Sequence, residues 1–359
     1  MPNRHHLTEF AGLPVVEFPG LDTVDHHHQR MVRQGIPVPD PYPPHAALAA
    51  ALAAPGSVAW RLRTEYPHRP YRPDRYFSDE PLEDASAYAR RFSEEVDLAA
   101  VAALIIGHIA SEHHDPGTDR ALAFMLDIAP KLTALRSLFF GEIRRQENEI
   151  SWIGHGDLAP LLAAFPDLAE FTVRGGSAGL GLRLGEHRGL RSLTVQSGAL
   201  RPEVVRDVCA SPLPNLERLE LWPGSKEYGG GSTPEDLAPV LSGEAFPRLR
   251  HLGLRNAEEL DDWIPALAGA PVLSSLHTLD LSLGTLTDEG AQVLLGAPAF
   301  RGLKRLDLHR HYLSEETAAR VRAEFAGAGV EVDVSAPREP DVDEYGGETH
   351  VHYYTAVSE

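Results

Sequence analysis

A short hydrophobic pattern recurs along the chain: an apolar residue, two variable positions, a second apolar residue, one variable position and a third apolar residue. Its first copy, VAALII, begins at Val101. Seven more copies begin at Leu135, Leu168, Leu190, Leu216, Leu249, Leu276 and Leu303. Successive copies begin 22 to 34 residues apart. Because the fourth and sixth positions are apolar and the fifth varies, each copy predicts a strand with one buried face.

The segments between these copies have the spacing of helices. Residues 202–210 and 288–297 each gather apolar side chains on one helical face. A further segment, VEVDV from Val330, alternates like a last strand. The repeating unit is therefore strand, turn, helix and turn. Because adjacent strands lie about 4.8 Å apart and packed helices about 8–10 Å apart, stacked units are expected to form an arc with its strands on the concave side.

Two segments resemble the leucine-rich repeat family, in particular its ribonuclease-inhibitor-like class with long repeats. They are LDLSLGTLTDEGAQVLL (279–295) and LDLHRHYLSEETAARV (306–321). The resemblance implies an α/β solenoid, a horseshoe or arc with a parallel concave sheet and convex helices. The chain departs from the family three residues after the last apolar position, where Asn or Cys is usual. That place holds Ile109, Ile143, Gly176, Gly198, Gly224, Ala257, Gly284 and His311. The whole chain also resembles a group of bacterial leucine-rich repeat proteins without an assigned activity.

The two ends of the chain differ from the repeats. Residues 1–45 are crowded with His, Pro and Arg, and we expect a partly flexible N-terminal extension with a hairpin around Gly12. Residues 46–100 are expected to form an irregular cap over the open end of the core, and residues 101–334 the repeats. The acidic residues 335–359 alternate at their end and predict a capping strand. The alternative is a tail that folds back over the concave face and regulates access to it.

Composition narrows the classes of function. Lys and Arg number 33 against 52 Asp and Glu, so the net charge is −19 and would repel nucleic acid and anionic lipid. The single cysteine, Cys209, excludes an intramolecular disulfide and is read as core filler. The longest apolar stretch, residues 98–106, is about half of the roughly 20 residues that cross a bilayer, and no apolar signal core is present. We therefore expect a cytoplasmic protein, monomeric on its own, that binds neither nucleic acid nor membranes.

The third, fifth and seventh positions of each copy are expected on the concave face, opposite the core positions. Eight copies with three positions each give 24 residues, comparable with the roughly 20–30 residues on each side of a standard interface. In the first two copies Ile105 and Phe139 fall on this face, and we expect the N-terminal extension to cover them. The candidate partner-binding residues are Arg174, Arg218, Glu220, Trp222, His251, Arg255, Asp280, Arg305, Asp307 and His309.

Two tryptophans matter for this interpretation. Trp and Arg are enriched at binding hot spots, so Trp222 beside Arg255 is the expected centre of the interface. The alternative is that the charged side chains pair across neighbouring strands and only solvate the sheet. Trp152 lies in a long connection, residues 142–157, and is expected to be buried and to anchor a solvated loop. The alternative is that this connection contacts a partner at the convex rim.

The chemical motifs are weak. Residues 175–179 match the G-x-S-x-G pattern with Ser177 at its centre, but no clear helix follows, so we interpret the segment as a glycine-rich turn. The consecutive histidines 26–28 cannot all face one metal. His350 and His352 share a strand face but supply only two ligands, fewer than a zinc site needs. We therefore expect no catalytic residue, cofactor or metal.

These observations favour a non-catalytic protein–protein interaction module, a scaffold that binds an unidentified protein partner on its concave sheet. Fold-level analogy supplies much of this hypothesis. Two alternatives stay open. One is a hydrolase, either serine-dependent or metal-dependent, and the other is a structural accessory subunit held in a complex through its cap and tail.

Overall fold

A computed structural model of the 359-residue chain describes residues 5–20, 43–64, 85–109, 118–176, 179–345 and 348–357. The histidines 26–28, most of the extension that the sequence predicts to be partly flexible, and Ser177 lie outside these ranges. The chain forms two compact units. The N-terminal unit consists of residues 2–148 and 167–171, and the C-terminal unit of residues 149–166 and 172–359. In the described ranges no helix is long and apolar enough to cross a membrane.

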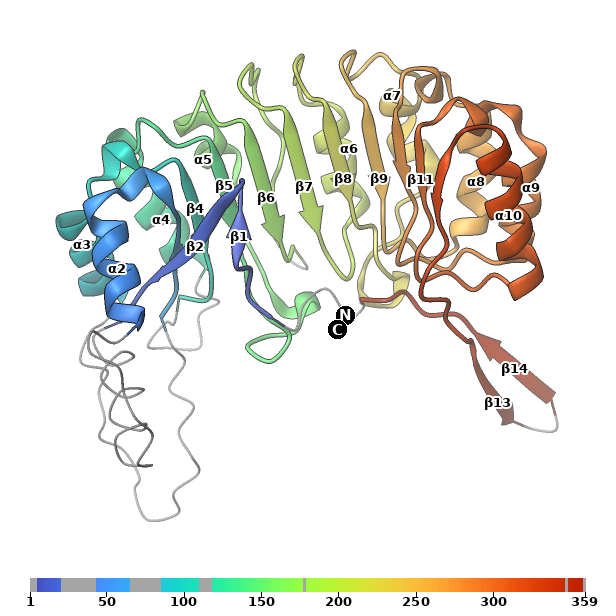
Figure 1. Cartoon of the computed structure of the whole chain (residues 1–359), viewed down its shortest axis with the longest axis horizontal. Coiled ribbons are helices and arrows are strands. Elements are labelled where there is room, and N and C mark those ends of the chain that lie inside the picture. Colours follow the sequence, from blue (N-terminus) through green and yellow to red (C-terminus); the bar gives the residue numbers. More distant parts are fainter. Residues whose placement is uncertain are drawn as a thin grey trace. The chain divides into compact units, whose positions relative to one another are not determined.

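The strands of the N-terminal unit hydrogen-bond in chain order (Figure 1). Its strands are β1 (Glu9–Phe10), β2 (Leu13–Phe18), β3 (Ala59–Leu62), β4 (Ala103–Ile106) and β5 (Ser137–Phe140). Its helices are α2 (Pro43–Ala53), α3 (Ala85–Glu95) and α4 (Thr118–Ile128). The antiparallel pair of β1 and β2 turns at Gly12, as predicted, and β2 to β5 are parallel. Gly12 has a φ of +72°, a conformation that glycine adopts without strain.

The N-terminal extension covers the apolar strip of the first two repeats. Phe10 is buried in one cluster with Ala103, Ile105 and Phe139. Its ring lies 6.1 Å from that of Phe139, centroid to centroid. A fully buried phenylalanine contributes roughly 1.5–3 kcal/mol relative to an exposed one, so this contact fixes β1 on the sheet. The prediction that the extension covers Ile105 and Phe139 is confirmed.

The strands of the C-terminal unit, β6 to β12, also follow one another in chain order. Its strands are β6 (Glu170–Arg174, which begins in the N-terminal unit), β7 (Ser192–Gln196), β8 (Arg218–Leu221), β9 (His251–Leu254), β10 (Thr278–Asp280), β11 (Arg305–Asp307) and β12 (Glu331–Asp333). Strands β7 to β12 pair in parallel. Parallel strands need crossover connections, and the helical segments of the repeats provide them. The predicted α/β class, with mostly parallel strands, is confirmed.

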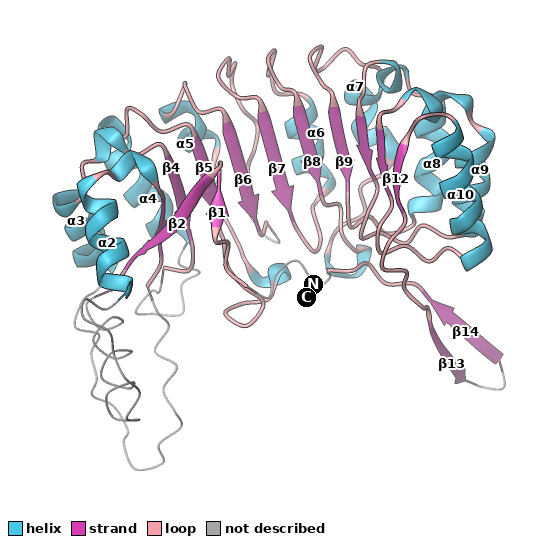
Figure 2. Cartoon of the chain, in the orientation of Figure 1, coloured by secondary structure: helices cyan, strands magenta, loops and turns pink. Residues whose placement is uncertain are grey.

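Helices cover one side of the sheet that these strands form (Figure 2). They are α5 (Ala159–Ala164), α6 (Pro202–Cys209), α7 (Ala238–Leu241), α8 (Leu260–Ala268), α9 (Asp288–Gly296) and α10 (Glu315–Gly327). Helix α9 packs between α8 and α10. The apolar faces predicted for residues 202–210 and 288–297 are buried, among them Val205 and Leu294.

The core lies between the strands and these helices. The fourth and sixth positions of the repeat are buried throughout, as Leu219 and Leu221 of β8 and Leu252 and Leu254 of β9 illustrate. The period of two in the sequence therefore fixes which strand face is left for the third and fifth positions. After β12, the strands β13 (Asp341–Tyr345) and β14 (Glu348–His352) form a separate antiparallel hairpin.

Candidate interaction surface

The predicted partner-binding residues of β8 to β11 share one strand face and form two rows. Parallel register aligns the outer row, which consists of Arg218, His251, Thr278, Arg305 and Glu331. The same register aligns the inner row, which consists of Glu220, Gly253, Asp280, Asp307 and Asp333. The structure therefore brings six of the predicted residues together, as the repeat spacing indicates.

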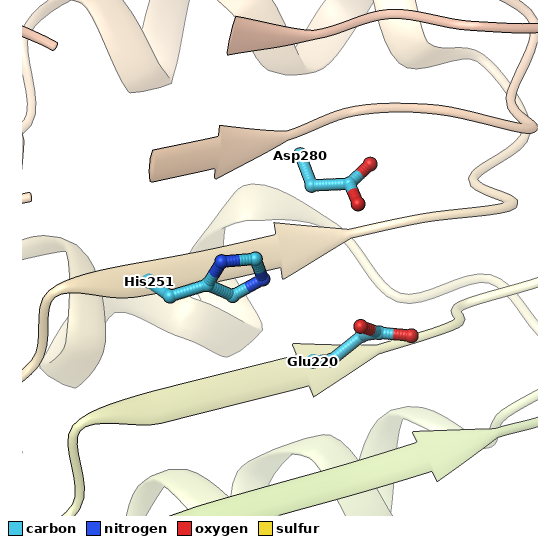
Figure 3. Close-up of side chains that lie close together, drawn as sticks. All are labelled: Glu220, His251 and Asp280. Carbon is cyan, nitrogen blue, oxygen red and sulfur yellow. The ribbon is translucent and has the colours of Figure 1, made fainter. Parts of the chain in front are cut away.

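Gly253 opens a space in the inner row. It lies between Glu220 and Asp280, and a Cβ atom at this glycine would be 3.0 Å from Glu220 Cγ. Figure 3 shows Glu220, His251 and Asp280 reaching toward one another from three neighbouring strands. Each offers a ligand atom within 4.8 Å of the other two. Nitrogen and carboxylate donors at such separations suit a divalent cation. Whether the cluster favours a cation depends on the charges that already surround it.

Arg255 supplies a positive charge to this cluster. Its guanidinium lies 3.1 Å (Nη1) from Glu220 Oε1 and 3.4 Å (Nε) from Asp280 Oδ2. Nε also donates to Ser282 Oγ at 3.0 Å. Both carboxylates are buried, and such ions persist only when paired and hydrogen-bonded. Arg255 thus already compensates the negative charge of the two carboxylates that a bound cation would otherwise neutralise. The charges of these residues therefore pair across neighbouring strands, and the binding of a partner by them stays a prediction.

The titration of the cluster follows from burial. Burial, together with the nearby Arg218 and Arg255, lowers the pKa of His251 to about 4, so the imidazole is neutral at neutral pH. Its Nε2 has no hydrogen-bond partner among the described residues. Burial also raises the pKa of Asp280, and Arg255 opposes that shift. The cluster therefore contains one fixed cation, two buried carboxyl groups and one neutral ring.

A second cluster repeats this design one strand further. Asp307, His309 and Asp333 place ligand atoms within 4.8 Å of one another. Arg305 contacts both carboxylates, at 3.3 Å for Asp307 and 3.9 Å for Asp333, and it also pairs with Glu331 at 2.5 Å. His309 Nδ1 lies 2.7 Å from Asp307 Oδ1. The expectation of no metal is not tested by this geometry and stays a prediction.

Trp222, the expected centre of the interface, is buried by other parts of the same chain. Its exposed fraction is 3 %. Ile150, Leu283, Ala356 and Val357 pack with it in one cluster. The indole Nε1 donates to Glu220 Oε1 at 2.8 Å, and Arg255 lies over the ring at 5.2 Å from its centroid. The end of the acidic tail has therefore folded back onto Trp222.

The remaining predicted positions differ in their surroundings. Arg174 of β6 is buried and donates to Gln196 Oε1 at 2.9 Å, which places it with β7 and apart from the rows. Trp152 is 71 % exposed, so the expected buried anchor is wrong, and the nearby Ile150 is buried instead. The rings of His350 and His352 stack on the exposed β14. Burial raises the pKa of the Cys209 thiol to about 12, as expected for core filler.

An ion-pair cluster in the N-terminal unit has no signature in the sequence. Glu142 accepts from His6 Nδ1 at 2.8 Å, from the Leu7 backbone N–H at 3.0 Å and from Arg61 Nε at 3.1 Å. Glu147 Oε1 lies 3.1 Å from His6 Nε2 and accepts from Arg63 at 3.0 Å. These bonds attach the start of the described chain to the loop after β5.

This attachment is expected to depend on pH. Burial disfavours a charged imidazole, but hydrogen bonds to Glu142 and Glu147 outweigh that penalty and raise the pKa of His6 above its ordinary 6.5. Burial also disfavours the ionised Glu142, but the His6 hydrogen bond and Arg61 outweigh it, and the pKa of Glu142 falls below its ordinary 4.5. The stabilisation is therefore present between these ordinary values. It is lost as pH rises through the pKa of folded His6 or falls through that of folded Glu142.

The measurement is the urea midpoint of unfolding at several pH values from about 5.5 to about 8.5, where the wild type should lose stability as pH rises. His6→Gln should lose most of that dependence. A wild-type midpoint that is constant over this range would contradict the role of His6.

Comparisons with known proteins bear on the fold. No family model matches the chain, and no curated protein is similar to it. Nineteen chains of known structure match. One is the crystal structure of a Bacteroides fragilis protein, with 30% sequence identity and a TM-score of 0.67. The match covers 76% of this chain and 73% of that chain. The present chain belongs to the same family as that Bacteroides protein. This membership supports the fold and assigns no activity.

Proposed function

We propose that the chain is a non-catalytic interaction module of the leucine-rich repeat type that binds a protein partner on the strand face of β8 to β11. The repeated strand–helix unit and the parallel strand order support that architecture. The observation on which the function rests is the division of this face into two rows. The inner carboxylates of Glu220, Asp280 and Asp307 are buried and paired with arginines, whereas Arg218 of the outer row is exposed.

The two rows have different roles in this proposal. Pairing in the inner row removes the conformational freedom of Arg255 and Arg305, so little entropy is lost when a partner binds over them. Arg305 keeps about 40 % of its side chain exposed while it is held by Asp307. Arg218 and Arg305 thus present donors to the same side of the sheet, and they suit a partner that offers carboxylates or backbone carbonyls.

The test is affinity capture from the native lysate, read by mass spectrometry, with Arg218→Glu beside the wild type. Arg218 is exposed, so its replacement should leave folding unchanged. The matched control is Arg322→Glu, which reverses another exposed charge, on α10 and away from the strands. We expect a protein that is captured by the wild type and by Arg322→Glu but not by Arg218→Glu. Equal capture by all three would overturn this face as the binding site.

A further inference from the structure

The last residues of the described chain pack against one set of side chains in the C-terminal unit. We call this the tail groove and define it by Trp222, Asn256, Leu283 and Tyr312. After β12 the chain runs out through the β13–β14 hairpin and then returns to the repeats (Figure 1). Residues 353–357 lie against the groove residues, which follow strands β8 to β11. The groove residues and the tail residues are far apart in the sequence. Their contact is therefore a tertiary contact and not part of a local turn.

The groove recognises the backbone of its occupant. Asn256 donates from Nδ2 to the Val357 carbonyl at 2.5 Å and accepts the Val357 N–H on Oδ1 at 2.8 Å. The Ala356 N–H donates to the Leu283 carbonyl at 2.8 Å. The Tyr312 hydroxyl donates to the Tyr354 carbonyl at 2.8 Å and accepts the Tyr354 N–H at 3.1 Å. Main-chain bonds of this kind hold a peptide whatever its side chains are.

Asn256 is specialised for this task. It is fully buried and has a φ of +56°, a left-handed conformation that asparagine tolerates better than most residues. A buried amide without partners is costly, and the two bonds to Val357 are what satisfies it. In the sequence it stands one place before the position at which the leucine-rich repeat pattern usually has Asn. Within the described residues, its side chain reaches the tail and, at 3.5 Å, the Ser197 carbonyl.

Side-chain pockets add a preference for small apolar residues. Ala356 and Val357 are buried with Trp222, Leu283 and Ile150. These contacts exclude water from Trp222, as the centre of a binding hot spot requires. A segment with small aliphatic residues at these two places therefore matches the contacts that the groove offers.

The tail itself is an imperfect ligand. Thr355 is buried, yet its hydroxyl has no hydrogen-bond partner among the described residues. A buried hydroxyl without a partner weakens binding, and a valine of the same shape would avoid that cost. The preceding hairpin does not depend on the position of the tail, because β13 and β14 pair with each other and Val342 and Val351 are exposed. A segment that fits better can therefore replace the tail.

We propose that the tail groove is a peptide-binding site for an aliphatic segment of the protein partner, and that residues 353–357 occupy it in the absence of that partner. This inference rests on the proposed function and specifies how the partner is recognised. Tethering gives the tail a high effective concentration at the groove, typically millimolar for short flexible links, so a competing segment must bind better than the tail.

The probe for this proposal is a synthetic peptide of residues 349–357, THVHYYTAV, with both ends blocked and a fluorophore at its N-terminus. The protein is the full chain with Ala356→Asp and Val357→Asp, which places two charges in the apolar pocket and releases the tail. The matched control is the full chain with Val342→Asp and Val351→Asp, which changes two exposed hairpin residues and leaves the tail seated. Circular dichroism verifies that both variants are folded.

We expect fluorescence anisotropy to detect saturable binding of the peptide to the released-tail variant. Binding to the wild type and to the hairpin control should be at least tenfold weaker, because their own tail competes. A peptide with Thr355→Val should bind roughly tenfold tighter than the natural one. A peptide with Val357→Pro lacks the N–H that Asn256 accepts and should not bind measurably.

Two results would overturn the proposal. One is a folded released-tail variant that does not bind the peptide, and the other is a wild type that binds it as tightly as that variant does. Neither result affects the strand face: if Arg218→Glu abolishes capture of a partner while the peptide fails to bind, the groove is excluded and the proposed function stands. If the peptide binds and capture is unaffected by Arg218→Glu, the groove stands and the strand face is excluded.

Discussion

Replacing Glu142 with glutamine is expected to lower the free energy of unfolding by about 3–5 kcal/mol, the range found when one partner of a buried ion pair is removed. Only 1 % of the Glu142 side chain is exposed, and it accepts from Arg61 and His6. Arg61 is itself buried, and its Nη2 donates to the Leu7 carbonyl, which cannot balance its charge. The substitution keeps the shape of the side chain and leaves a guanidinium charge without a counter-ion.

Urea denaturation followed by circular dichroism measures this effect. The control is Glu94→Gln, the same chemical change on the exposed face of α3, which should change stability by less than about 0.5 kcal/mol. An equally small effect at both positions would show that Arg61 finds another acceptor, and that Glu142 does not organise the cluster.

Gly224→Ala is expected to cost about 3 kcal/mol or more, through two separate effects. Gly224 has a φ of +73°, where any residue with a Cβ loses roughly 1–2 kcal/mol. In addition, an added Cβ would lie 1.8 Å from the Gly198 carbonyl oxygen, far inside van der Waals contact. Because that atom is backbone from the preceding repeat, the clash can be relieved only by separating two stacked turns.

Gly229→Ala separates these two effects. Gly229 has a φ of +97°, and nothing lies within 4 Å of the Cβ that it would gain. It should therefore show the conformational cost alone, roughly 1–2 kcal/mol. Thermal and urea unfolding of both variants provide the comparison. If Gly224→Ala were no worse than Gly229→Ala, the close packing of the two turns would not contribute to stability.

The strands could be predicted because their pattern is local and repeated. In a stack of similar units, one buried face per strand fixes the positions of Leu219 and Leu252 and also of their polar neighbours. The same logic places Glu220 and Asp280 in one row, since both occupy the fifth position of their copies. The pattern cannot show that Gly253 leaves a space between Glu220 and Asp280, because these two residues belong to adjacent strands and not to its own.

The tail and the loops could not be predicted for a different reason. Asn256 and Val357 are 101 residues apart in sequence, and a contact of that range has no period that a single sequence reveals. The burial of Trp222 depends on that contact. Its residue type therefore suggested a binding hot spot, but could not show that the tail covers its side chain. Trp152 lies in an irregular connection, where hydrophobicity alone does not decide which of two neighbours, Ile150 or Trp152, turns inward.

The last repeat strand bears on self-association. Strand β12 ends the hydrogen-bonding order of the described repeats, and its outer edge is an open template for another chain. It is only three residues long, and two of them, Glu331 and Asp333, are acidic. A second copy adding its own β12 there would bring like charges together and gain few hydrogen bonds. The acids that fix Arg305 thus also discourage end-to-end polymerisation of the sheet.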